Sequence, residues 1–171
     1  MGNLQLPEVW LRGPLPSIPA LLQPVAHALL QAREEINAYL LDFDESLLWK
    51  RPVGSASVGF HLQHIAGVQD RLFTYAKEEQ LNEQQLKYLK NENQENVAVT
   101  LALLLENLNH QTEKSIEQLQ QTDAGILTET RGVGRKQIPS TVLGLLFHTA
   151  EHTMRHTGQL LVTVKILKAG L

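Results

Sequence analysis

Three histidines recur at steps of four near the end of the chain: His148, His152 and His156. They lie in the segment 145–167, LLFHTAEHTMRHTGQLLVTVKIL, whose apolar residues predict a helix. Residues four apart on a helix are neighbours, with Cβ atoms about 5–6 Å apart. Two such imidazoles can reach one metal ion, as in the H-E-x-x-H zinc helix. The spacing therefore predicts an H-x-x-x-H ligand pair, either His152 with His156 or His148 with His152.

A second pair of histidines, His61 and His64, lies in the segment 55–80, where we expect another helix that begins at Ser55 or Ser57. Helical periodicity places His61 within the apolar arc and His64 at its edge, so His61 is expected to be the more inward of the two. A buried imidazole needs a partner, and a metal ion is one kind of partner. Spacing alone does not decide which of the two histidines would join a site on the last helix.

The composition of the 171 residues excludes several other kinds of chemistry. The chain has no cysteine, which excludes disulfides, thiolate-ligated zinc and a cysteine nucleophile. The formal net charge is −3 and the basic residues are scattered, which argues against nucleic-acid binding. The sequence has neither an apolar run long enough for a membrane helix nor the apolar core of a signal peptide. We therefore expect a cytoplasmic protein with no nucleic-acid or membrane partner.

Helical periodicity extends over most of the chain and predicts the all-α class. Long helices are expected over residues 18–43, 55–80, 97–121 and 141–169. Pro24 makes a start near Gln23 the alternative for the first helix, and Ser140 or Thr141 is expected to cap the last.

The remaining segments are expected to be irregular. They are a proline-rich arm over residues 1–17, a polar, solvated connection over 82–96 with a short helix near 83–89, and a loop over 122–140. Four long helices without strand alternation predict a single domain over residues 1–171. Its architecture would be an antiparallel four-helix bundle with a long crossover connection.

The order and spacing of four segments resemble the DinB/YfiT-like superfamily. These segments are the connector Trp49-Lys50-Arg51-Pro52, HLQHIAG at 61–67, GRKQIPSTVLGLLFHTAEH at 134–152 and EHTMRHTGQL at 151–160. The resemblance implies a four-helix bundle, commonly a homodimer. It also implies a divalent metal held by one histidine of the second helix and an H-x-x-x-H pair of the last helix.

Carried over to this chain, the resemblance implies the ligands His64, His152 and His156. Many relatives read His-Arg-Gly-Gln at the end of the last motif, whereas this chain has His156-Thr157-Gly158-Gln159. The missing arginine leaves the ligands intact but removes any contact that it makes to a substrate or partner.

Four further residues are expected to orient the ligands or line a pocket: His148, His61, Glu151 and Gln159. Three imidazoles suit zinc, nickel or a similar divalent ion, and the general affinity order does not choose among these metals. Three protein ligands leave coordination positions open for water or substrate.

Some relatives use such a site to activate a low-molecular-weight thiol, so the resemblance implies a metal-dependent thiol S-transferase or a related metal-assisted transfer. A chain without cysteine would take its sulfur from the cosubstrate. The alternative interpretation is a non-catalytic metal-binding or stress-response bundle, whose histidines stabilise the fold or its dimer.

Overall fold

The structure is a computed structural model that describes residues 6–96 and 98–170. Within these residues the chain forms mostly helices, together with one small antiparallel sheet. The helices are α1 (Gln23–Tyr39), α2 (Val58–Ala76), α3 (Glu83–Asn91), α4 (Leu101–Gln121) and α5 (Val142–Lys168), and the strands are β1 (Thr130–Val133) and β2 (Ile138–Thr141). The predicted all-α class is therefore correct for most of the chain. Among the helices in the described ranges, none is long and apolar enough to cross a lipid bilayer.

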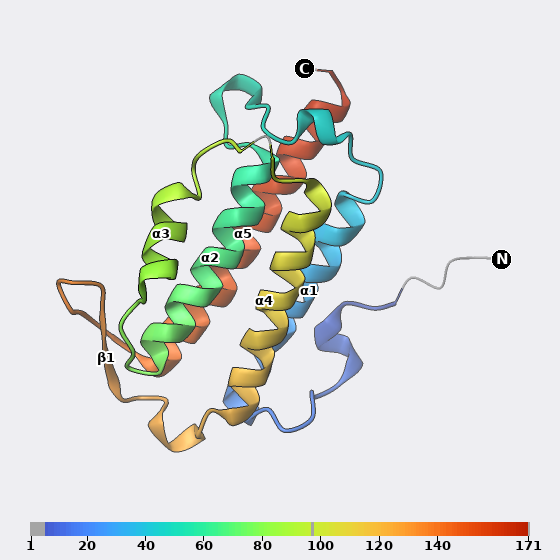
Figure 1. Ribbon diagram of the computed structural model, residues 1–171. Helices are drawn as coiled ribbons and strands as arrows, with labels where there is room; N and C mark the ends of the chain where they lie inside the picture. The colour runs from blue at the N-terminus through green and yellow to red at the C-terminus, as the bar shows by residue number, and fades with distance from the viewer. Residues whose placement is uncertain (1–5, 97, 171) are drawn as a thin grey trace.

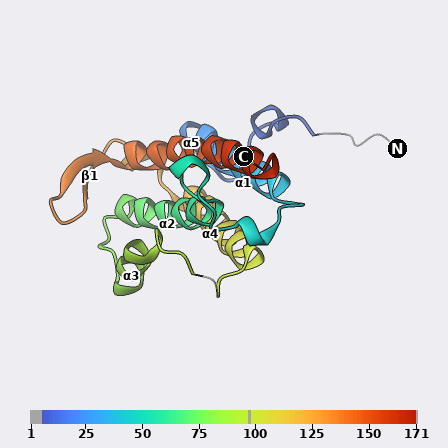
Figure 2. The ribbon, with the colours of Figure 1, turned by 90° about the horizontal axis from the view of Figure 1, so that it is seen from above.

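The four longest helices run side by side (Figure 1). Seen from above, α1 and α5 form one layer, α2 and α4 form the other, and α3 lies outside α2 (Figure 2). Helix α5 packs against both α1 and α2, and α4 packs against the same two helices. The direct contact between α2 and α5 is the one that matters most for function, because these two helices carry five of the histidines.

Side-chain caps determine where the long helices begin. Ser57 Oγ accepts a hydrogen bond from Phe60 N at 3.2 Å, so Ser57 rather than Ser55 starts α2. Thr141 Oγ1 accepts from Gly144 N at 3.0 Å and starts α5 in the same way. Thr100 caps α4, whereas the predicted start of that helix at Val97 lies outside the described residues.

Helices α1 and α2 are shorter than the sequence predicts. Helix α1 starts at Gln23, which confirms the alternative start that Pro24 predicted, and Pro24 lies in the first turn, where proline is tolerated. It ends at Tyr39, and α2 ends at Ala76. Beyond Ala76, Glu78 adopts a positive φ of 64°, which a continuing right-handed helix does not allow.

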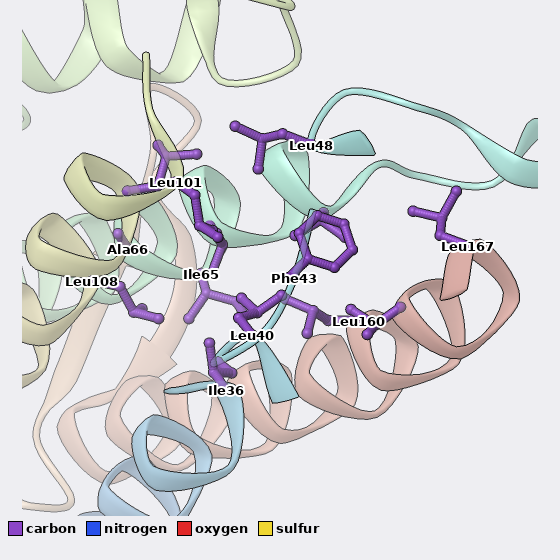
Figure 3. Packing of buried hydrophobic residues seen from close by; sticks show 14 residues of the cluster. Ile36, Leu40, Phe43, Leu48, Ile65, Ala66, Leu101, Leu108, Leu160 and Leu167 are labelled. Carbon is purple, nitrogen blue, oxygen red and sulfur yellow. The ribbon is translucent and has the colours of Figure 1, made fainter. Parts of the chain in front are cut away.

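Two clusters of buried apolar side chains fill the interior. One joins the end of α1, the first half of α2, α4 and the end of α5, and includes Ile36, Leu40, Ile65, Leu108 and Leu160 (Figure 3). The other joins the start of α1, the ends of α2 and α4 and the start of α5, and includes Leu22, Leu29, Phe73, Leu119 and Leu146. Each fully buried side chain of this kind contributes about 1.5–3 kcal/mol relative to an exposed one. Together the clusters fix α2 against α5 at both ends of the pair.

The predicted loop over residues 122–140 is wrong in part, because it contains the hairpin β1–β2. The strands pair antiparallel, with Thr130 opposite Thr141 and Val133 opposite Ile138. Strands of four residues are too short for alternation to distinguish them from a loop. Composition places Arg131 in a polar, solvated loop, but in the structure it is buried, and its Nε donates to the carbonyl oxygen of Ala76 at 3.0 Å.

Candidate metal centre

Three histidines from two helices converge where α2 contacts α5. His64 of α2 faces His152 of α5, with their Nε2 atoms 2.9 Å apart. His156 lies one turn further along α5, and its ring centroid is 4.6 Å from those of both His64 and His152. One potential ligand atom of each ring lies within 4.8 Å of the other two. The structure thus brings together the three residues expected to bind a metal.

The packing of the helices explains this convergence. Neighbouring side chains Leu62, Ile65 and Leu160 are fully buried, which holds the two helix backbones close together. The three histidines are only half-buried, because they lie at the edge of the helix–helix contact. The separation of four between His152 and His156 then sets both rings against His64, as helical geometry predicts.

His64 is oriented by a buried carboxylate on its outer side. Its Nδ1 lies 2.9 Å from Glu92 Oε1, and Glu92 is only 6% exposed. Arg71 donates to the same carboxylate from Nη1 at 2.9 Å and from Nη2 at 3.2 Å. A carboxylate at this distance accepts a hydrogen from Nδ1, which leaves the lone pair of Nε2 facing the other histidines.

Glu92 is a carboxylate rather than a carboxylic acid at neutral pH. Burial raises its pKa, but hydrogen bonds from His64 and Arg71 and the charge of Arg71 outweigh this effect, so the pKa lies below its ordinary value.

His61 supports His156 in a similar way. It is 2% exposed, the more inward of the two α2 histidines as periodicity predicts. Its Nδ1 lies 3.0 Å from Nδ1 of His156. This contact occupies one nitrogen of the His156 ring and leaves the other, Nε2, as the nitrogen available to a metal.

Burial keeps these rings neutral. Desolvation lowers the pKa of His61 to about 4, of His152 to about 4 and of His156 to about 3, and the neighbouring His64 adds to each lowering. At pH 7 these three imidazoles therefore carry no charge, so no positive charge on His152 or His156 opposes the approach of a metal ion.

Phe60 forms an apolar wall beside the cluster. Its ring stacks on His64 with centroids 5.1 Å apart and an interplanar angle of 14°. It also meets His61 and His156 edge to face, at 5.7 Å and 6.3 Å. An aromatic ring here limits the access of water to the histidines from the start of α2.

His148 and Glu151 lie on the exposed side of the cluster. His148 Nδ1 is 2.7 Å from Glu151 Oε1, and Glu151 also accepts from Arg155 Nη2 at 2.6 Å and 2.9 Å. Together with His152 they form a second group that could hold an ion, which keeps the alternative pair His148 and His152 geometrically open. This group is less suited to binding, because the side chain of His148 is 51% exposed and Arg155 already pairs with the carboxylate.

Gln159 is exposed and contributes to a neighbouring cavity instead. The cavity has a volume of about 590 Å³ and reaches His61. Its lining is Ser55, Ala56, His61, Arg155, Gly158, Gln159, Val162, Thr163 and Ile166.

One nitrogen separation is compatible with a shared metal ion as well as with a hydrogen bond. Two imidazoles about 2.0–2.1 Å from one zinc ion have nitrogens roughly 2.9–3.4 Å apart, depending on the coordination angle. The 2.9 Å between His64 and His152 falls in this range. His152 Nδ1 is buried and has no hydrogen-bond partner among the described residues. The contact of its other nitrogen, Nε2, with His64 therefore decides which nitrogen of the His152 ring carries the hydrogen.

Sequence reasoning missed Glu92 and Arg71. Glu92 belongs to the polar segment 82–96, which the sequence predicts as a solvated connection. The structure corrects this expectation, since Glu92 and Gln85 are both buried. The short helix was expected there, but nothing in its composition indicates that the residue after it turns inward towards an arginine on α2.

Its mostly helical fold and the imidazole cluster between two long helices place this chain among candidate metal-binding helical proteins. The chain belongs to the DinB superfamily, whose family profile matches residues 28–160. No curated protein matches the sequence. Among solved structures, the chain is similar to a crystal structure of a protein from Streptococcus pneumoniae. The two share 13% sequence identity over 85% of this chain and 88% of the other, with a TM-score of 0.63, which shows the fold alone.

Proposed function

We propose that this protein binds one divalent metal ion through His64, His152 and His156. The observation that carries the proposal is the convergence of three imidazoles from two helices, together with the buried carboxylate that orients one of them. Carboxylate–histidine–metal arrangements of this kind recur in metalloproteins, because the carboxylate fixes the ring and raises the basicity of the ligating nitrogen.

The donor set favours zinc, nickel or a similar ion. Three neutral nitrogens without a thiolate suit mid-row divalent metals, and the general order of affinities does not select one of them. With three protein ligands, the site keeps at least one position for water or a substrate, the layout of a catalytic rather than a closed structural zinc site.

The chemistry we propose is metal-assisted transfer of a low-molecular-weight thiol. A bound divalent ion supplies Lewis acidity and lowers the pKa of a water or thiol that it binds. Phe60 shields the histidines on one side, and the cavity of about 590 Å³ beside His61 is large enough for a small molecule. Because the chain has no cysteine, the thiol would enter as a substrate.

The non-catalytic alternative rests on the side chains near the site that could transfer protons, because each of them is already paired. Glu151 is paired with Arg155, and His61 with His156, so neither group near the site is free to serve as a general acid or base. Under this alternative the metal joins α2 to α5 and stabilises the fold, and no transfer occurs.

The finer architectural proposal is an antiparallel four-helix bundle of α1, α2, α4 and α5, with α3 on the crossover between α2 and α4. The pairwise contacts among the four long helices support it. We also propose a homodimer, supported by exposed apolar residues on α5 such as Phe147 and Val162, which are 60% and 56% exposed.

Elemental analysis of untagged protein tests the metal proposal. We expect about one equivalent of zinc or nickel per wild-type chain and none in the double variant His152→Ala/His156→Ala. His110→Ala removes an exposed histidine outside the cluster and should retain the metal. A wild-type chain without stoichiometric metal would refute the proposal. If metal is bound, the transfer of simple thiols to a generic electrophile, measured in wild type and double variant, separates the enzyme from the structural alternative.

A further inference from the structure

Helix α3 is attached to the body of the protein in an unusual way, because it buries almost no apolar side chain. Gln85 is the buried residue among its nine, Tyr88 is half-buried, and Leu86 and Leu89 are 42% and 43% exposed. Since the hydrophobic contribution scales with the apolar area removed from water, it contributes little to holding α3 against α2.

Polar contacts attach α3 instead. Gln85 Nε2 donates to Asp70 Oδ2 at 2.9 Å and to Thr74 Oγ1 at 2.8 Å. Tyr88 donates from its hydroxyl to the carbonyl oxygen of Gln63 at 3.0 Å. The last of these contacts comes from Glu92, the residue directly after α3, which reaches His64 and Arg71 on α2.

The surface of α2 is shaped to receive Glu92. A Cβ atom at Gly67 would lie 2.6 Å from Arg71 Nη1, 2.7 Å from Glu92 Oε2 and 2.8 Å from Tyr88 Cε1. These distances are too short for van der Waals contact, so the ion pair can lie this close to the helix only because residue 67 has no side chain. Glycine inside a helix lowers its stability, and here it makes room for the carboxylate.

We propose that Glu92 is a positioning residue that couples metal binding at His64 to the docking of α3 on α2. The inference rests on the proposed metal site. Glu92 accepts the hydrogen of His64 Nδ1 and so keeps the Nε2 lone pair directed at His152. A metal on Nε2 withdraws electron density from the ring, which makes Nδ1–H a stronger donor to Glu92.

The coupling acts in both directions. A metal that strengthens the bond from His64 to Glu92 favours the docked position of α3, and a docked α3 raises the affinity for the metal by the same factor. Helix α3 is the natural element to respond, because apart from Glu92 it is attached mainly by the hydrogen bonds of Gln85 and Tyr88.

The test compares Glu92→Ala with Glu95→Ala, an identical change three residues further along the same connection at an exposed carboxylate. Zinc affinity is measured by competition with a chromophoric chelator, and hydrogen exchange of residues 83–92 with and without zinc. We expect Glu92→Ala to weaken zinc binding about 10–100-fold and Glu95→Ala to leave it within about twofold. Zinc should slow the exchange of α3 in wild type and in Glu95→Ala, and not in Glu92→Ala.

A second variant distinguishes the loss of the Glu92 contact from a general loss of folding. Glu92→Ala leaves Arg71 without its partner, whereas Arg71→Met/Glu92→Leu leaves no unpaired charge and should show the same loss of affinity and of zinc-dependent protection. Wild-type affinity in this double variant, or zinc-dependent protection of α3 without Glu92, would overturn the coupling while leaving the metal site standing. A wild-type chain that binds no zinc would overturn both.

Discussion

The Nδ1 atoms of His61 and His156 lie 3.0 Å apart, and this contact joins the most buried histidine of α2 to the cluster on α5. At this distance one nitrogen carries the hydrogen and the other accepts it. His61 therefore supports His156 in the way that Glu92 supports His64. Each contacts one ring nitrogen and leaves the other nitrogen of that ring available as a ligand.

This relationship predicts different consequences for two neighbouring substitutions on α2. His64→Ala removes a ligand and should abolish stoichiometric zinc binding. His61→Ala removes only a supporting contact, so it should retain one zinc per chain with an affinity lowered by about 10–100-fold. Isothermal titration of both variants with zinc measures the difference. The reverse order, with zinc kept by His64→Ala and lost by His61→Ala, would show that His61 is the third ligand.

The lowered pKa values of the buried histidines predict how the stability of the metal-free protein depends on pH. His61, His152 and His156 have folded-state pKa values of about 4, 4 and 3, below the ordinary value of 6.5. Between these values and 6.5 the unfolded chain binds protons that the folded chain does not. The contribution of these three histidines to stability is therefore complete above pH 6.5 and is lost as the pH decreases towards their folded-state pKa values.

The urea midpoint of chelator-treated protein measures this loss. We expect a lower midpoint at about pH 5 than at about pH 7.5, and a weaker pH dependence in His152→Gln/His156→Gln. Equal midpoints at the two pH values would contradict the conclusion that these rings stay neutral in the folded protein.

Two glycines predict opposite effects of the same substitution. A Cβ at Gly59 of α2 would lie 2.6 Å from Cζ3 and 2.7 Å from Cε3 of Trp49, whereas a Cβ at Gly158 of α5 meets nothing within 4 Å. Gly59→Ala should therefore destabilise the protein by about 1–3 kcal/mol, because the indole must move. Gly158→Ala should stabilise it by up to about 1 kcal/mol through helix propensity.

Chemical denaturation of the two alanine variants beside wild type provides the measurement. Because both substitutions lie within helices, propensity alone would make both stabilising. A stabilising effect at Gly59 would mean that the Trp49 ring is not packed on α2.

Much of the histidine site follows from sequence, because it depends on the regular geometry of single helices. The separation of four between His152 and His156 sets their neighbouring positions on α5, and periodicity correctly placed His61 inside and His64 at the edge of α2. The choice of His64 over His61 as the proposed ligand needed the family resemblance, since spacing within one helix carries no information about the facing helix.

The parts that the sequence did not predict depend on contacts between segments far apart in the chain. Glu92 looks like one more charged residue in a polar connection until Arg71 and Gly67 are placed beside it. Arg131 likewise looks solvated until the hairpin carries it to the end of α2 at Ala76. In each case a tertiary contact overrides the local composition. The residue that makes this contact lies far away in the sequence, so no local pattern predicts it.

A crystal structure of the zinc-loaded protein, with anomalous diffraction measured on both sides of the zinc absorption edge, tests the central claim most directly. We predict one anomalous peak per chain, bonded to ring nitrogens of His64, His152 and His156, with Glu92 hydrogen-bonded to His64 behind it. A peak bound by His148, Glu151 and His152 instead, or no peak between α2 and α5, would contradict the proposed site.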